Sequence, residues 1–427
     1  MQRIAKLFSV PELRNRVLSV LGLLVAYRAL AAIPIPDIDT SRLAEFFGNN
    51  GLLGFLNFFS GGGLSNLSLV MLGVSPYITA TIIMQLLTII FPRLKEMYYE
   101  DGARGQAKFN RISRYATVPL AFVSGYGFLT LLISQNIIPP LAPLDMLRDV
   151  IIIAAGSMAA LWIGELITEQ KVGNGISLII FSGIVAGLPT QVGLAFQSFT
   201  PDVLIGYGVV ALLIVLGIVY ITEGERRVPI AYARQVRGNK MYGGAASYLP
   251  LKVNSAGMIP LIFAISVLTF PQFIAQAVGL ISPDWGTRLA DYVNAFLANG
   301  WAYSGFYFAL VFAFTYFYTS ITFNPEEVAK NLQRSGGFIP GIRPGEQTEQ
   351  MFSRVLSRIT FFGAFALGLV AVLPTAIQGG ISLVTGTPVT GSSSLALSGT
   401  AILIVVAVAL ESMRQIDSQL SLRDYDR

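Results

Sequence analysis

The sequence predicts an all-α membrane protein with ten transmembrane helices. Three observations lead to this fold class: the chain has 427 residues, 53% of them are hydrophobic and only 12% are charged. A soluble domain carries about 25% charged residues, so roughly half of the usual charge is missing. Since a transmembrane helix needs about 20 apolar residues, a chain of this length and composition has room for ten of them.

The apolar residues fall into ten runs, most of them bounded by charged residues, proline or glycine, as helix ends in a bilayer are. The first run follows Arg14 and Arg16 and ends at Ile33-Pro34-Ile35-Pro36 without a small-residue cleavage site, so we expect a retained span rather than a cleaved signal. The predicted spans are 17–34, 74–92, 115–134, 151–168, 176–195, 204–222, 256–273, 304–323, 355–376 and 396–412.

Positive charge alternates between the connections of these spans. The alternate loops hold only Arg42, Arg148 and Arg288, and Arg28 lies near the outer end of span one, where its side chain can snorkel. The other 25 of the 29 lysines and arginines lie in segments 1–16, 93–114, 165–175, 223–255, 325–358 and 411–427. The positive-inside rule therefore predicts that these segments and both termini are cytoplasmic, which agrees with an even number of crossings.

Several classes of enzyme and transporter are excluded by residues that the chain lacks. Without His or Cys it has no Ser–His dyad, no HExxH zinc site, no disulfide and no thiolate chemistry. The middle thirds of the ten runs contain no ionisable residue, and Glu165 lies near the inner end of span four, within reach of interfacial water. We therefore expect no enzymatic activity, no cofactor and no metal site, although ion-coupled transport through the carbonyls of broken helices stays open.

Irregular segments remain as the candidates for function. Residues 58–67 are apolar but too short and too glycine-rich to cross a bilayer, which favours a half-helix dipping into a cavity from outside over an ordinary amphipathic loop. Loop 223–255 is predicted to be an extended helical or hairpin finger. Loop 325–354 contains a rigid turn that displays Arg343 between two prolines. Loops this long are usually functional, and we expect a cytosolic partner to dock on them.

A series of motifs in this chain closely resembles the SecY family, the channel subunits of the Sec protein translocase, in its bacterial form. The motifs follow the family order over nearly the whole chain. They are Ile33-Pro34-Ile35-Pro36, Phe59-Ser60-Gly61-Gly62, Pro76-Tyr77-Ile78-Thr79-Ala80, Gln85-Leu86-Leu87, Gly173-Asn174-Gly175-Ile176-Ser177, Leu249-Pro250-Leu251-Lys252-Val253-Asn254, Asn324-Pro325-Glu326 and Gly341-Ile342-Arg343-Pro344-Gly345-Glu346-Gln347.

The resemblance implies two pseudo-symmetric five-helix halves, 1–200 and 201–427, around an hourglass pore. It also implies that the pore opens sideways into lipid, with spans two and three on one side of the opening and spans seven and eight on the other. It implies a plug, residues 61–72, which begins Gly61, Gly62, Gly63, Leu64, Ser65, Asn66 and Leu67. It places an aliphatic pore ring at Val74, Ile78, Ile176, Ile180, Ile262 and Ile404. It places the lateral gate at Thr79, Gln85 and Asn254.

The same resemblance implies the function and the partners. The chain is expected to translocate unfolded secretory polypeptides across the bacterial inner (plasma) membrane and to release hydrophobic segments into lipid. The implied partners are SecE and SecG, the SecA ATPase, the ribosome with its RNA, signal sequences, preproteins and membrane lipids. Arg343 matches the family's arginine at which SecA or a ribosome docks. At the tip of loop 223–255 the family often has adjacent basic residues, whereas this chain has Asn239 and Lys240 with Arg237 nearby. The alternatives are a secondary transporter built from inverted repeats and, less favoured, a membrane-embedded enzyme.

Overall fold

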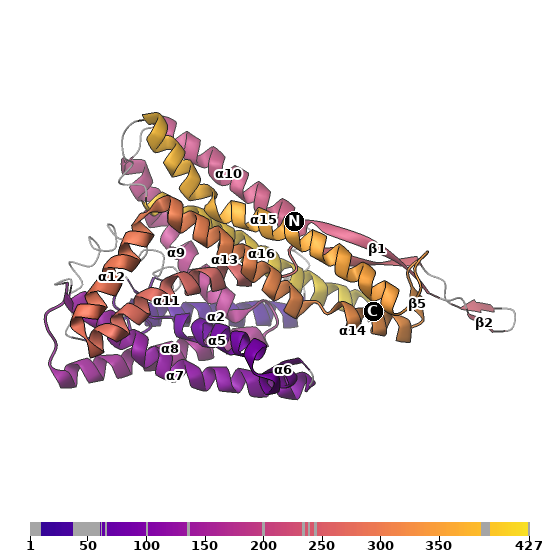
Figure 1. Ribbon diagram of the computed structural model, residues 1–427, viewed down its shortest axis with the longest axis horizontal. Helices are drawn as coiled ribbons and strands as arrows, with labels where there is room; N and C mark the ends of the chain where they lie inside the picture. Colours follow the sequence, from indigo (N-terminus) through magenta and orange to yellow (C-terminus); the bar gives the residue numbers. More distant parts are fainter. Residues whose placement is uncertain are drawn as a thin grey trace.

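The computed structural model describes residues 10–36, 60, 62–64, 66–99, 101–134, 137–198, 201–232, 235–237, 240–242, 246–385 and 393–425. Long helices form a bundle from which a small β sheet projects at one end, called the sheet end below (Figure 1). Each predicted span coincides with all or part of one helix. These are α2 (Pro11–Ala32), α5 (Ser75–Ile90), α7 (Gly102–Ser134), α8 (Pro143–Glu169), α9 (Gly175–Ser198), α10 (Pro201–Glu223), α11 (Ile259–Ile281), α13 (Gly300–Thr322), α15 (Glu346–Thr385) and α16 (Ser393–Tyr425).

Length and hydropathy alone make five of the described helices long and apolar enough to cross a membrane. A sixth candidate is the pair of α5 and α6 (Pro92–Tyr99), which meet at a bend of 112°. The bend lies at Phe91, whose backbone is extended (φ −106°, ψ 106°) because the following Pro92 disfavours the helical conformation of the residue before it. Shorter apolar stretches within α9, α10 and α11 occupy three further predicted spans.

Several helices extend beyond the predicted apolar runs. Helix α7 begins at Gly102 rather than 115, α15 begins at Glu346 rather than 355, and α16 continues to Tyr425. A helix needs apolar residues only within the bilayer. The polar and charged residues before or after the apolar run keep good helix propensity in water, so the helix continues beyond the run. The sequence analysis also missed α12 (Pro283–Ala298), an amphipathic helix in the connection between α11 and α13.

The two long loops join in one small sheet at the sheet end. In loop 223–255, β1 (Glu225–Tyr232) pairs antiparallel with β4 (Ala246–Lys252), so the hairpin alternative is correct. The short strands β2 (Gln235–Arg237) and β3 (Lys240–Tyr242) pair at its tip. From the other loop, β5 (Gly337–Phe338) follows α14 (Pro325–Arg334) and pairs with the end of β1.

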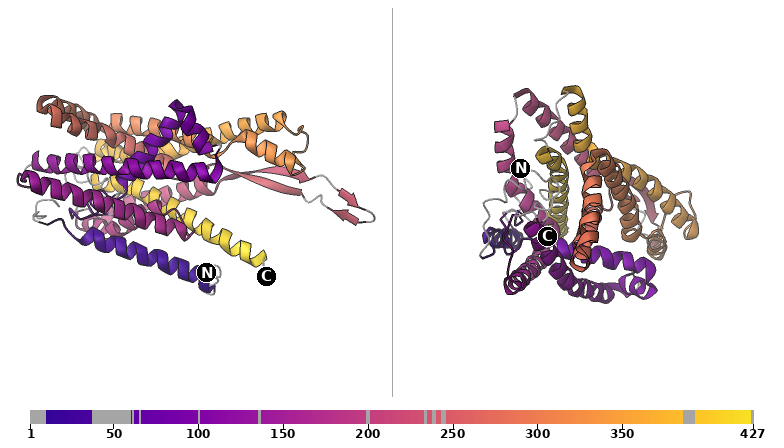
Figure 2. Two further views of the ribbon diagram at one scale, coloured as in Figure 1. Left: turned by 90° about the horizontal axis from the view of Figure 1, so that it is seen from below. Right: turned by 60° about the vertical axis from the view of Figure 1, so that its left-hand side comes forward.

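An apolar core of its own anchors this sheet to the bundle. Val228 of β1 and Leu251 of β4 pack with Leu332 of α14 and Phe352 of α15, and all four are buried. The two loops therefore share one apolar core with the sheet-end part of α15. Figure 2 shows that α2 begins and α16 ends at the same end of the bundle as the sheet.

Candidate functional site

An aliphatic cluster closes the centre of the bundle. The six residues to which the sequence analysis assigns the pore ring come from the start of α5, from α9, from α11 and from α16. Five of them are buried in one continuous apolar core, and the sixth, Ile176, is partly buried against it. They are Val74, Ile78, Ile176, Ile180, Ile262 and Ile404. The structure therefore brings together residues that lie up to 330 positions apart in sequence.

A cavity of about 550 Å³ opens onto three of these residues, Ile78, Ile176 and Ile262. Its walls come from α5, α7, α8 and α9 on one side and from α11 and α13 on the other. The wall residues of α7 and α8 lie in the parts of these helices nearest the sheet end, where α7 begins and α8 ends (Figure 1). The aliphatic ring thus forms the floor of a cavity on the sheet-end side.

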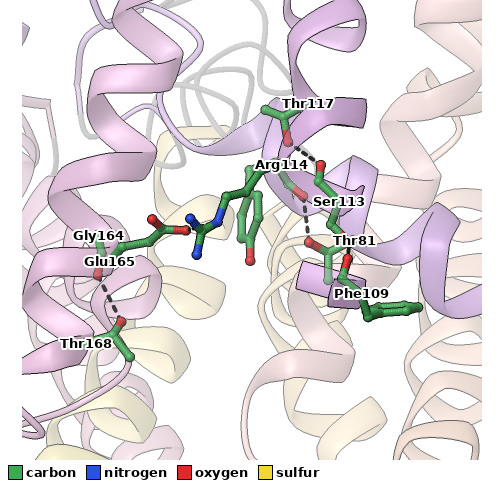
Figure 3. Close-up of polar contacts among 9 residues, drawn as sticks. Thr81, Phe109, Ser113, Arg114, Thr117, Gly164, Glu165 and Thr168 are labelled. Carbon is green, nitrogen blue, oxygen red and sulfur yellow. Dashed lines mark hydrogen bonds and ion pairs between the residues drawn. The ribbon is translucent and has the colours of Figure 1, made fainter. Parts of the chain in front are cut away.

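One wall of the cavity is polar. The Nε atom of Arg114 in α7 lies 2.6 Å from Oε1 of Glu165 in α8, and the two side chains face each other in Figure 3. Thr168, one turn further along α8, donates from Oγ1 to the carbonyl oxygen of Gly164 (2.9 Å) and accepts from the backbone N–H of Gly175 (2.9 Å). These bonds fix the end of α8 against the start of α9.

The three predicted lateral-gate residues have different surroundings. Gln85 of α5 lines the cavity; it is only 8% exposed, and its Oε1 atom has no hydrogen-bond partner among the described residues. Thr79 donates from Oγ1 to the carbonyl oxygen of Ser75 (3.1 Å) within α5. Asn254 is buried in the turn before α11 and does not line the cavity. Helix α11 packs against both α5 and α7, so helices from the two sides of the predicted gate are in contact.

The predicted plug lies beyond the ring, on the side away from the cavity. Gly61 and Ser65 are outside the described residues. The described part is a chain of turns, so the half-helix expected over residues 58–67 is wrong for Gly62, Gly63, Leu64, Asn66 and Leu67. The reason is the backbone: φ is +82° at Gly62, +41° at Leu67 and +53° at Gly73, and left-handed residues interrupt a helix.

The plug packs between the ring and the far ends of α7 and α8. Val70 belongs to the same apolar core as the ring. Leu64, Leu67 and Met71 pack instead with Leu129 and neighbouring residues of α7 and α8. Asn66 is exposed. Apolar side chains therefore hold the plug against the N-terminal half of the bundle.

Hydrogen bonds attach the plug to α2 and the segment that follows it. The hydroxyl of Tyr27, in α2, donates to the carbonyl oxygen of Ser60 across 2.7 Å, and this bond is buried. The backbone N–H of Ile35 donates to the oxygen of Leu67 (2.8 Å), and that of Leu69 donates to Ile33 (3.0 Å). The sequence analysis missed this attachment, because no pattern signals which helix a string of turns rests against.

Arg28 differs from the expectation that it snorkels towards water. Its Nη2 atom donates to the carbonyl oxygens of Ser182 (2.8 Å) and Gly183 (3.1 Å) in α9. Backbone carbonyls are the acceptors that a cation finds inside a bundle without carboxylates. The arginine thereby links α2 to α9 close to the plug.

The predicted docking residues lie at the sheet end. Arg343 is exposed in the turn after β5, where φ is +84° at Gly341 and +102° at Gly345. Arg237 of β2 and Lys240 of β3 are paired partners at the tip of the hairpin. Near Arg343, a groove of about 480 Å³ is lined by three arginines that the sequence analysis did not single out, namely Arg226, Arg354 and Arg358.

No metal centre emerges in the part of the chain that the structure describes. The described residues contain no group of three or more Asp, Glu, His or Cys side chains that could hold a metal ion. The described residues offer a cavity, an apolar cluster behind it and a chain of turns beyond that.

Comparisons with known proteins agree over nearly the full length. The family model for SecY matches residues 68–413. The protein translocase subunit SecY of Streptomyces coelicolor is 40% identical over 440 residues, covering 99% of this chain and 98% of that protein. A solved SecY structure concerned with the plug that stabilises the closed translocation channel has a TM-score of 0.63 at 19% identity, covering 93% of this chain and 90% of that one. Sec61 from the canine ribosome-channel complex has a TM-score of 0.58 at 17% identity, covering 93% and 91%.

Proposed function

The chain belongs to the SecY family of protein-conducting channels, and we propose that unfolded secretory polypeptides cross the membrane through its aliphatic ring while hydrophobic segments leave sideways into the bilayer. One observation carries the proposal: the polar cavity ends on buried aliphatic side chains, and the plug packs against the far side of the same apolar core. The resemblance found in the sequence is confirmed by the 40% identical relative.

An aliphatic ring suits a channel whose substrates carry every kind of side chain. Charged or hydrogen-bonding groups at the narrowest point would hold some residues of the passing chain and delay it. Aliphatic side chains form no such bonds, and an apolar constriction that is narrow wets poorly and resists ions. The ring at Ile78, Ile180 and Ile262 would therefore seal the resting channel together with the plug and still let a polypeptide slide through.

Sideways release requires an interface that lipid can reach. We place it between α5 and α7 on one side and α11 and α13 on the other, with Thr79, Gln85 and Asn254 as its polar residues. A Leu or Ile contributes about −0.5 kcal/mol to insertion, whereas an Arg at the membrane centre costs about +3 kcal/mol. A run of roughly ten to twenty apolar residues would therefore decide whether a segment leaves into lipid.

The translocase partners would bind in two places. SecE and SecG would complete the channel in the membrane, and the cytosolic partners would dock at the sheet end. SecA or a translating ribosome would use Arg343 together with Arg237 and Lys240, since arginine and lysine pair with carboxylates and with RNA phosphates. The canine Sec61 relative was solved in a ribosome-channel complex, which supports this proposal.

The orientation and the two halves belong to the same proposal. Residues 1–200 and 201–427 would form two halves that separate at the lateral gate. The sheet end and both termini would be cytoplasmic in the plasma membrane, because most lysines and arginines outside the spans lie in the six segments at that end. The relatives are named as translocase subunits, and we propose that the chain itself carries out no covalent catalysis.

Reconstitution tests the function directly. Vesicles that contain this chain and SecE, with SecA and ATP outside, are expected to take up a preprotein into a protease-protected space. Vesicles without SecA are the control. Absence of protected preprotein with folded components would contradict the proposal. Saturable uptake of a small solute without SecA would favour the transporter alternative.

A further inference from the structure

The cavity has two chemically different walls. The wall from α7 and α8 carries Arg114, Glu165 and Glu169. The opposite wall, from α11 and α13, is mainly apolar, and there Phe263 and Tyr318 meet edge to face with ring centroids 6.2 Å apart. A ligand that fits both walls needs a charged part and an apolar part next to each other.

The polar wall carries an excess of negative charge. Its two carboxylates face a single guanidinium, and that guanidinium is already paired with Glu165. Glu169 is exposed and makes no ion pair within the described residues. The nearest lysine in sequence, Lys171, lines a separate groove with Lys252 and Glu411 instead.

Helix α8 adds to this negative charge because it ends at Glu169. The last carbonyl groups of a helix carry a partial negative charge of roughly half an elementary charge. Glu165 and Glu169 are also one turn apart, so their Cβ atoms lie about 6 Å from each other. The end of α8 therefore presents two carboxylates and a helix C-terminus to the same space.

A second observation points to a polar ligand at this cavity. Gln85 is more than nine-tenths buried, lines the cavity, and leaves Oε1 without a hydrogen-bond partner among the described residues. A buried acceptor without a donor is costly, and such atoms in native proteins call for an explanation. A donor group supplied by a bound polypeptide would satisfy it.

We propose that the α8 carboxylates Glu165 and Glu169 hold the basic n-region of a signal sequence at the mouth of the cavity, while its apolar h-region follows the opposite wall towards the ring. This inference rests on the proposed function. A signal sequence consists of a positively charged n-region followed by 7–15 apolar residues, which is the order of charge and apolar surface that the cavity offers. The pairing would orient the signal with its basic end on the sheet-end side.

Charge reversal at Glu169 tests the proposal. In vesicles with SecE and SecA, Glu169→Lys is expected to lower the translocation rate of a preprotein with a basic n-region about fivefold, the scale of an exposed ion pair. Glu169→Gln should give a smaller loss. The matched control is Glu96→Lys, which makes the same charge change on α6, on an exposed residue that does not line the cavity.

The n-region of the preprotein provides the second arm. With a neutral n-region, Glu169→Lys should translocate as well as the unchanged channel, and with an acidic n-region it should translocate better. The differences should shrink at high salt because ions screen exposed charges. Equal rates with the basic preprotein, or an equal loss with the neutral one, would overturn the inference. If the unchanged channel translocates none of the three preproteins, the proposed function itself fails.

Discussion

Removing one hydroxyl from Tyr27 should loosen the plug. The Tyr27 side chain is completely buried, and its hydroxyl donates to the carbonyl oxygen of Ser60, the residue directly before the plug. In Tyr27→Phe the ring still fills its site, so the packing of α2 is kept and only the hydrogen bond is lost. The carbonyl oxygen of Ser60 keeps the bond that it accepts from the backbone N–H of Gly63 (3.2 Å), so the variant loses the Tyr27 bond alone.

The size of the effect follows from that one bond. A neutral hydrogen bond contributes about 0.5–1.5 kcal/mol, and no larger loss is expected because the carbonyl oxygen of Ser60 keeps its bond from Gly63. This corresponds to a shift of about two- to twelvefold in the ratio of closed to open plug. The remaining bonds from Ile35 to Leu67 and from Leu69 to Ile33 limit the opening of the plug, so the resting channel should leak without losing its fold.

Single-channel recording in planar bilayers measures this shift as the fraction of time that the resting channel conducts ions. The matched control is Tyr307→Phe, because the hydroxyl of Tyr307 is buried but has no hydrogen-bond partner among the described residues. We expect the open fraction to rise in Tyr27→Phe and to stay unchanged in Tyr307→Phe. Equal open fractions in the two variants would refute the reasoning that the Tyr27 bond retains the plug.

Three further predictions concern the ring, the plug seat and the docking turn. Replacing Ile78, Ile180 and Ile262 of the ring by asparagine should raise the ion leak of the resting channel, since polar side chains wet a narrow constriction. Unchanged conductance in a planar bilayer would refute the placement of the ring at these residues. In Gly156→Ala the new methyl group would overlap the carbonyl oxygen of Leu69. The plug should therefore be destabilised by about 1–3 kcal/mol, and the ion leak of the resting channel should rise. The control is Gly217→Ala, which has open space around the new methyl group and should leave the leak unchanged. Arg343→Glu should slow SecA-driven translocation about tenfold, as loss of a docking arginine does, while membrane insertion of the chain, measured by carbonate extraction, stays normal; equal defects in both assays would return Arg343 to an ordinary surface charge.

The helices follow from the sequence because each apolar run satisfies a local requirement. Within a bilayer, a run of apolar residues must form its own backbone hydrogen bonds, and an α-helix does this without partners. Pro76 and Pro260 lie in the first turns of α5 and α11, where a missing N–H group costs nothing. Even the hairpin of loop 223–255 was one of two local alternatives.

The ring shows the limit of local reasoning. Each of its members is an isoleucine or valine in an apolar run, and nothing in its own surroundings separates it from a residue that faces lipid. The resemblance to the SecY family selected the six positions, and the structure then places them in one apolar core. Their sealing role stays a prediction until the leak is measured.

The composition and order of the residues by themselves determined that this chain forms a helical membrane protein, where most of its spans lie, and which chemistry it lacks. Tertiary structure alone decided that Tyr27 reaches Ser60, that Arg28 reaches two carbonyl oxygens in α9, and that Arg114 faces Glu165. Backbone hydrogen bonding and transfer out of water act on each segment separately, so they can be read along the chain. Contacts between segments depend on how helices pack and on turns such as Leu67, whose left-handed backbone no residue preference predicts.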